Sequence, residues 1–75
     1  MHSYKNADHD TGVIAYEINK DSIAIQFKDG SLYVYTAKSA GPKAISQMKT
    51  LAKKGEGLTT YINQHVRENY QSKLR

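Results

Sequence analysis

The sequence predicts an α+β fold in which a three-stranded antiparallel meander (β-β-β) is followed by two amphipathic helices packed on one sheet face. Three observations predict it. Apolar residues alternate with period two in three runs between residues 12 and 36, the hairpin signal Asp29-Gly30 separates the last two runs, and apolar residues recur at helical spacing twice after residue 41. Seventy-five residues are too few for two cores, and 39% hydrophobic with 24% charged residues is a globular composition. We therefore expect a single domain over residues 12–72 after a flexible, polar N-terminal arm over residues 1–11.

The three alternating runs predict strands over residues 12–19, 22–28 and 31–36. Asp29-Gly30 favours a two-residue type I′ turn, because both central positions of that turn need positive φ. A two-residue loop pairs Phe27 with Leu32 and determines the register of the two strands that it joins.

This register predicts one apolar and one open face for the sheet. The open face is polar or small except for Tyr33 and Tyr35. The apolar face must be covered, and its residues are Ile14, Tyr16, Ile18, Ile23, Ile25, Phe27, Leu32 and Val34.

The cover is predicted to come from two helices. The first is expected over residues 42–54, because Pro42 suits a first helical turn and Gly55 a C-terminal stop; its stripe is Ala44, Ile45, Met48, Leu51 and Ala52. The second begins at Leu58 and fades near Tyr70; its stripe is Leu58, Tyr61, Ile62, His65 and Val66. Residues expected in one shared core are Ile25, Phe27, Val34, Ile45, Met48, Ile62 and Val66.

The charge of +4 is unevenly distributed along the chain. Residues 1–36 carry three lysines against five acidic residues, a net −2, whereas residues 37–75 carry eight Lys and Arg against two Glu, a net +6. A positive half attracts nucleic acid or acidic partners, and it also serves solubility alone. The chain has no cysteine, which excludes a disulfide scaffold and fits a cytoplasmic location. We expect neither a signal peptide nor a membrane span, because no apolar run is long enough.

Two motifs carry a resemblance to a known family. The first is Tyr33-Val34-Tyr35 after Phe27-Lys28-Asp29-Gly30, and the second is Tyr61-Ile62-Asn63 followed by Val66-Arg67 and Tyr70. In their order and spacing they resemble the KTSC domain, which is named for the C-terminus of some lysyl-tRNA synthetases and also occurs as stand-alone bacterial proteins. The chain departs from the family pattern at Ala37-Lys38 and over residues 54–60. The resemblance implies a small module for which RNA binding has been suggested.

The function predicted from these observations is weak binding of RNA or other single-stranded nucleic acid through an exposed Tyr-x-Tyr sheet face. Exposed aromatic rings can stack bases, and cationic side chains can contact phosphates. Alternatively, the tyrosines merely cover sheet backbone, and the stem of Arg67 merely covers apolar surface. The candidate binding residues are Tyr33, Tyr35, Gln26, Lys28, Lys53, Lys54 and Arg67.

The alternative function is a protein-protein interaction or homo-oligomerisation module that uses an edge strand. If neighbouring strands pair in order, residues 31–36 form an unprotected edge on which a second copy can pair. An enzyme is not predicted, because the chain has no cysteine nucleophile, Gly-rich phosphate loop or His-x-x-x-His. His65 is the best acid/base candidate, and a packed histidine is the commoner interpretation. No cofactor, metal site or small-molecule substrate is predicted.

Overall fold

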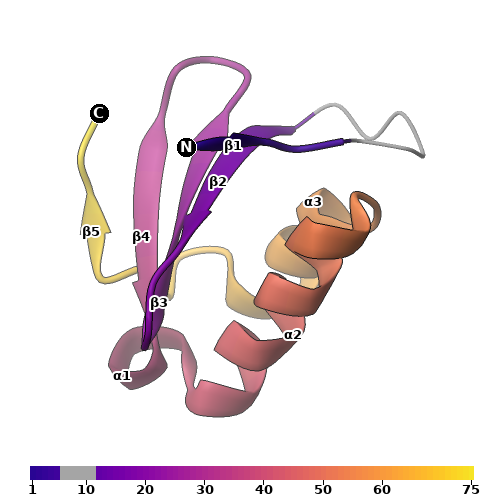
Figure 1. Ribbon diagram of the computed structural model, residues 1–75. Coiled ribbons are helices and arrows are strands. Elements are labelled where there is room, and N and C mark those ends of the chain that lie inside the picture. Colours follow the sequence, from indigo (N-terminus) through magenta and orange to yellow (C-terminus); the bar gives the residue numbers. More distant parts are fainter. Residues whose placement is uncertain (6–11) are drawn as a thin grey trace.

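The computed structural model describes residues 1–5 and 12–75, which form an antiparallel sheet with helices on one face (Figure 1). The five strands follow chain order across the sheet: β1 (His2–Ser3), β2 (Val13–Ile18), β3 (Ser22–Phe27), β4 (Leu32–Thr36) and β5 (Ser72–Lys73). The helices are α1 (Ala37–Ala40), α2 (Pro42–Lys54) and α3 (Leu58–Tyr61), which continues into the π-helical turn η1 (Ile62–Val66). No helix in the described part of the chain is long and apolar enough to cross a membrane. The predicted α+β class is confirmed.

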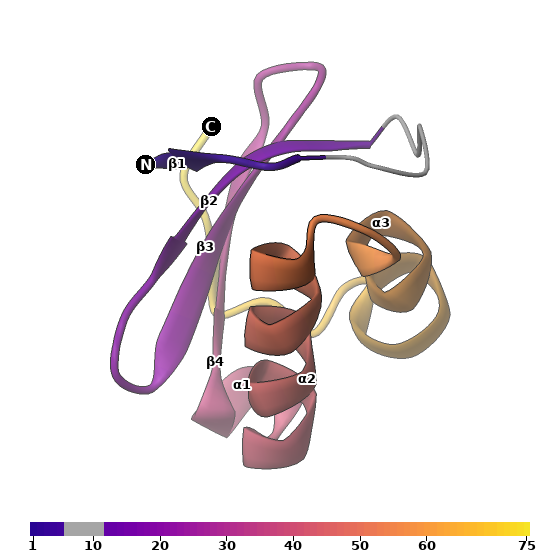
Figure 2. The same cartoon turned by 45° about the vertical axis from the view of Figure 1, so that its right-hand side comes forward.

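The first predicted helix coincides with α2, which packs against the sheet (Figure 2). Pro42 occupies its first turn, and Gly55 ends it in the left-handed conformation at φ 83°, where its N–H donates to the carbonyl of Leu51. The second helix is shorter than predicted. It widens into the π-helical turn, in which the N–H of Arg67 donates to the carbonyl of Ile62, and it ends at Val66.

The β3–β4 hairpin has a three-residue loop, so the predicted register is wrong by one residue. The N–H of Gly30 donates to the carbonyl of Phe27, and the N–H of Phe27 donates to the carbonyl of Ser31. Gly30 has φ 91°, as expected for a three-residue loop that ends in a left-handed residue. Ile25 consequently pairs with Tyr33. A shift of one residue moves every side chain of β4 to the opposite face.

The register places Tyr33 and Tyr35 on the helix-covered face and Leu32 and Val34 on the other. Tyr35 is only 1% exposed and packs in the core. The predicted open tyrosine face is therefore wrong, as is the placement of Val34 in the core. A buried Tyr needs a partner for its hydroxyl, and Tyr35 has one in the carbonyl of Arg67.

A β-bulge at Ile14 changes which residue of β2 enters the core. The pairing with β3 shifts between Val13, which faces Phe27, and Ala15, which faces Gln26. Val13 is buried, whereas Ile14 is 46% exposed. The prediction that Ile14 lies on the covered face is therefore wrong.

Both ends of the chain add strands to the meander. Of the predicted flexible arm, His2–Ser3 pair with β2, and Tyr4 is buried, so these residues belong to the domain. The remainder of the predicted arm, residues 6–11, lies outside the described residues. Ser72–Lys73 pair with β4, which is therefore not an edge strand. This corrects the structural basis of the predicted edge-strand interaction.

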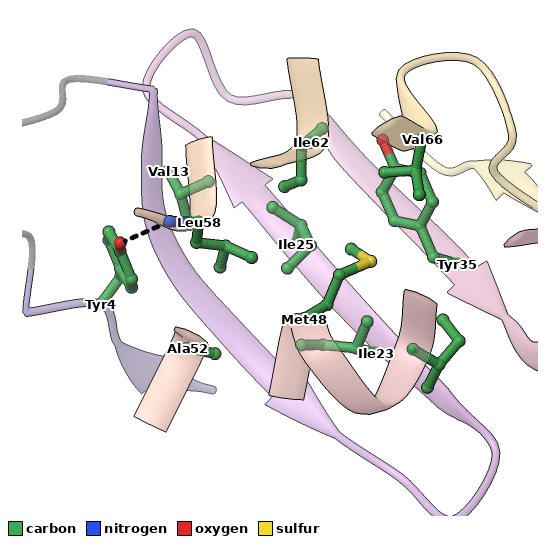
Figure 3. Close-up of a cluster of buried hydrophobic side chains, with 11 residues drawn as sticks. Tyr4, Val13, Ile23, Ile25, Tyr35, Met48, Ala52, Leu58, Ile62 and Val66 are labelled. Atoms are coloured by element: carbon green, nitrogen blue, oxygen red, sulfur yellow. Dashed lines mark hydrogen bonds between the residues drawn. The ribbon is translucent and has the colours of Figure 1, made fainter. Parts of the chain in front are cut away.

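The core lies between the sheet and α2, α3 and η1 (Figure 3). Its buried residues are Tyr4, Val13, Ile23, Ile25, Tyr35, Ile45, Met48, Ala52, Leu58, Ile62 and Val66. Ile25, Ile45, Met48, Ile62 and Val66 are buried as predicted, and Phe27 is partly buried against them. The helical stripes therefore cover the sheet as expected, although β4 contributes tyrosines to the interface.

Candidate binding pocket

A pocket of about 490 Å³ lies between the β3–β4 hairpin and the chain that follows η1. It exists because the helical turn ends at Val66, so the hairpin end of the covered face is only partly covered. Phe27 and Tyr33 remain half-buried there. Tyr70 packs against the core from the segment that leads to β5 and lines the same pocket.

The rings of Phe27 and Tyr70 meet the ring of Tyr33 at steep angles. The ring centres of Tyr33 and Tyr70 are 4.7 Å apart with 70° between the ring planes. Phe27 and Tyr33 are 5.4 Å apart at 90°. Tyr35 lies nearly parallel to Tyr33 at 6.5 Å. Edge-to-face contacts of this kind are favourable, so the rings support one another.

Tyr35 joins the pocket to the core. Its hydroxyl donates to the carbonyl of Arg67 over 3.0 Å. Burial, together with the neighbouring Tyr33 and Tyr70, raises the pKa of the Tyr35 phenol to about 12. The phenol therefore remains a protonated donor at neutral pH and holds the backbone at the start of the segment with Arg67 and Tyr70.

Four charged side chains line the pocket, as two neighbouring pairs that each combine a cation with a carboxylate. Lys28 and Asp29 come from the hairpin loop, and Arg67 and Glu68 come from the residues after η1. All four are exposed. The Asp29 carboxylate accepts a hydrogen bond of 2.9 Å from the N–H of Ser31, which lowers the pKa of that carboxyl.

A further cation contacts the aromatic cluster from β5. The ammonium group of Lys73 lies 5.6 Å from the ring centre of Tyr33, within the range of a cation–π interaction. Lys73 pairs with Tyr33 across the sheet, so the strand register places it there.

Four of the seven predicted binding residues line this pocket: Tyr33, Tyr35, Lys28 and Arg67. The structure does not bring the other three to it. Gln26 pairs with Leu32 and faces the uncovered side of the sheet. Lys53 and Lys54 lie in the last turn of α2, where Lys54 forms an ion pair of 3.1 Å with Glu56.

Tyr70, Asn63 and Lys73 were missed as candidates, although all three lie in or beside the pocket. The pattern of aromatic, apolar, Asn and later Arg and Tyr that carries the family resemblance contains both Asn63 and Tyr70 and would have identified them. No sequence signal points to Lys73, because its position depends on β5 pairing with β4.

His65 lies outside the pocket, on the exposed side of η1. Its ring packs against Tyr61 with 4.5 Å between ring centres. Among residues 1–5 and 12–75, no group of three or more His, Cys, Asp or Glu side chains is arranged to hold a metal ion.

Comparison of the chain with protein-family models, with curated proteins and with solved structures finds no match in any of the three.

Proposed function

We propose that the domain is a non-catalytic module that binds single-stranded nucleic acid weakly in the pocket between the β3–β4 hairpin and the segment after η1. RNA is the expected form, because RNA binding has been suggested for the KTSC domain, which the two sequence motifs resemble. One observation carries the proposal: a single pocket holds half-buried aromatic rings and exposed cationic side chains. Bases stack on aromatic rings and phosphates pair with cations, so single-stranded nucleic acid matches both parts of the lining.

The rings available to a base are those of Tyr33 and Tyr70. Both are half-buried, whereas Tyr35 is buried and supports them from below. A stacked base contributes about 1–3 kcal/mol. One or two such contacts correspond to weak binding.

The cations available to phosphate are Arg67 and Lys28, on opposite walls of the pocket. Arg67 can form two parallel hydrogen bonds to a phosphate, and the net +6 of residues 37–75 adds long-range attraction. Asp29 and Glu68 offset part of this charge at close range. Of the basic residues in that half of the chain, Arg67 lines the pocket and Lys73 lies beside it, so part of the positive charge and the aromatic rings share one surface.

The direct test is an NMR titration of the isotopically labelled protein with a nine-nucleotide RNA of mixed sequence at low salt. We expect shifts at the amides of Tyr33, Arg67 and Tyr70, and none at Ala24 and Gln26 on the uncovered side of the sheet. Unchanged resonances around the pocket would refute the proposed function.

A pair of variants separates the pocket from the general charge of the domain. Arg67→Gln should weaken RNA binding several-fold and lower the slope of log affinity against log salt by about one. Lys38→Gln removes the same charge from α1, outside the pocket, and should have a smaller effect. Equal losses in both variants would show that only net charge matters.

A further inference from the structure

We infer that the pocket accepts one unstacked nucleotide, as found at a strand end or in a loop, and not a run of successive stacked bases. This inference rests on the proposed function of the same pocket. It concerns the number of nucleotides that the site binds. The presence of rings and cations does not by itself determine that number.

The first argument is the angle between the rings. Successive stacked bases lie parallel to one another and need parallel supports or one flat surface. Tyr70 stands at 70° to Tyr33, and Phe27 at 90°. A base that stacks on one of these rings meets the next ring edge-on, so the ring geometry fits a single flat group.

The second argument is the size of the pocket. Its volume of about 490 Å³ falls within the range of small-ligand sites, roughly 300–1,000 Å³. Tyr35 closes it toward the core, and the hairpin loop and the Arg67–Tyr70 segment form its walls. An extended strand needs a longer groove that follows its backbone over several nucleotides.

The third argument is the order of charges around the pocket. Each cation that lines the pocket has a carboxylate as its chain neighbour, Asp29 beside Lys28 and Glu68 beside Arg67. One phosphate can pair with Arg67 or Lys28. The phosphates of further nucleotides that cross the rim meet Asp29 or Glu68, and like charges repel. The rim thus favours one phosphate over a continuous backbone.

The test compares ligands of increasing length by the same NMR titration: the four nucleoside 5′-monophosphates, trinucleotides and nonanucleotides, with inorganic phosphate as the control. We expect a monophosphate to shift the same resonances of Tyr33, Tyr70 and Arg67 as the nonamer. Its Kd should lie within about tenfold of the nonamer's, because added nucleotides contribute no further stack.

The possible outcomes are distinct. If the nonamer shifts the pocket and monophosphates do not, or if affinity rises with every added nucleotide, the inference is wrong and the proposed function stands. If no ligand shifts the pocket, both are wrong. If inorganic phosphate reproduces the shifts of the monophosphates, the site binds only an anion and the inference is wrong.

A substitution of Tyr70 in the pocket wall provides an independent measurement. Tyr70→Leu removes one stacking ring and should weaken monophosphate and nonamer by the same factor, about 5- to 150-fold. Tyr61→Leu is the matched control, because Tyr61 is also half-buried but packs on His65 outside the pocket. Loss of nonamer binding alone in Tyr70→Leu would contradict the inference. Tyr70→Phe keeps the ring and should retain binding of both ligands.

Discussion

The hydroxyl group of Tyr35, on strand β4, donates a hydrogen bond of 3.0 Å to the backbone carbonyl of Arg67, 32 residues further along the chain. This contact links the core to the pocket wall directly after Val66, the last residue of the π-helical turn. It exists only because the hairpin register turns Tyr35 toward the helices.

Replacing Tyr35 with Phe should lower the free energy of unfolding by about 1–3 kcal/mol, because the partly buried carbonyl of Arg67 loses its donor while the ring stays in place. Urea denaturation measures the loss. Tyr33→Phe is the matched control: the described structure gives its hydroxyl no such bond, and we expect a change below about 0.5 kcal/mol. Equal effects of the two substitutions would contradict the role assigned to the hydrogen bond.

Stability should fall at alkaline pH because of the same phenol. Its pKa is about 12 in the folded protein and 10.0 when unperturbed, so the unfolded chain loses the proton first. The contribution is complete below pH 10 and is lost as the pH rises toward 12, on the order of 2 kcal/mol. Unfolding curves at several pH values should show this decline, and Tyr35→Phe should decline less steeply. Parallel declines would argue against a raised pKa for Tyr35.

Tyr4 should contribute to stability even though it precedes the meander. Its ring is buried, and its hydroxyl accepts a 3.1 Å hydrogen bond from the N–H of Leu58 in the first turn of α3 (Figure 3). Tyr4→Phe leaves that buried donor unsatisfied and should cost about 1–3 kcal/mol in a thermal or urea melt. Tyr16→Phe, at a half-buried position, serves for comparison and should cost less. Unchanged stability of Tyr4→Phe would instead support a flexible arm that contributes nothing to stability.

Two isoleucines test the bulge and the core. Ile25 is 0% exposed and Ile14 is 46% exposed. Ile25→Ala should cost roughly 2–5 kcal/mol, through lost burial and the cavity that remains. Ile14→Ala should cost less than about 0.5 kcal/mol. A large effect at Ile14 would mean that β2 pairs with β3 without the bulge.

The lysines at the end of α2 should affect RNA binding only at long range. Changing Lys53 and Lys54 together to Gln should flatten the salt dependence of affinity but leave the pocket shifts caused by a nucleotide unchanged, since neither residue lines the pocket. Fluorescence anisotropy across a salt series, beside the NMR titration, distinguishes the two effects. Loss of the pocket shifts in this double variant would place these lysines in the site.

The amino-acid pattern was sufficient for the elements that depend on local signals. Helix α2 begins at Pro42 and ends before Gly55, as predicted. The strands β2, β3 and β4 lie close to their predicted ranges. These features follow from backbone preferences and from apolar periodicity, which the chain carries locally. The pattern also selected four residues that line the pocket, although it placed the tyrosines on the wrong face.

The tertiary structure decided which face each residue of β4 occupies and where the chain ends are held. Asp29-Gly30 is compatible with a two-residue turn and with a three-residue loop ending in left-handed Gly30, and β4 is apolar on both faces, with Leu32 and Val34 on one and Tyr33 and Tyr35 on the other. Local sequence therefore cannot distinguish the two registers. Packing does, because Tyr35 can reach the carbonyl of Arg67 only from the helix-covered face. Strands β1 and β5 have two residues each and no period to detect, so they form only where the sheet already offers an edge.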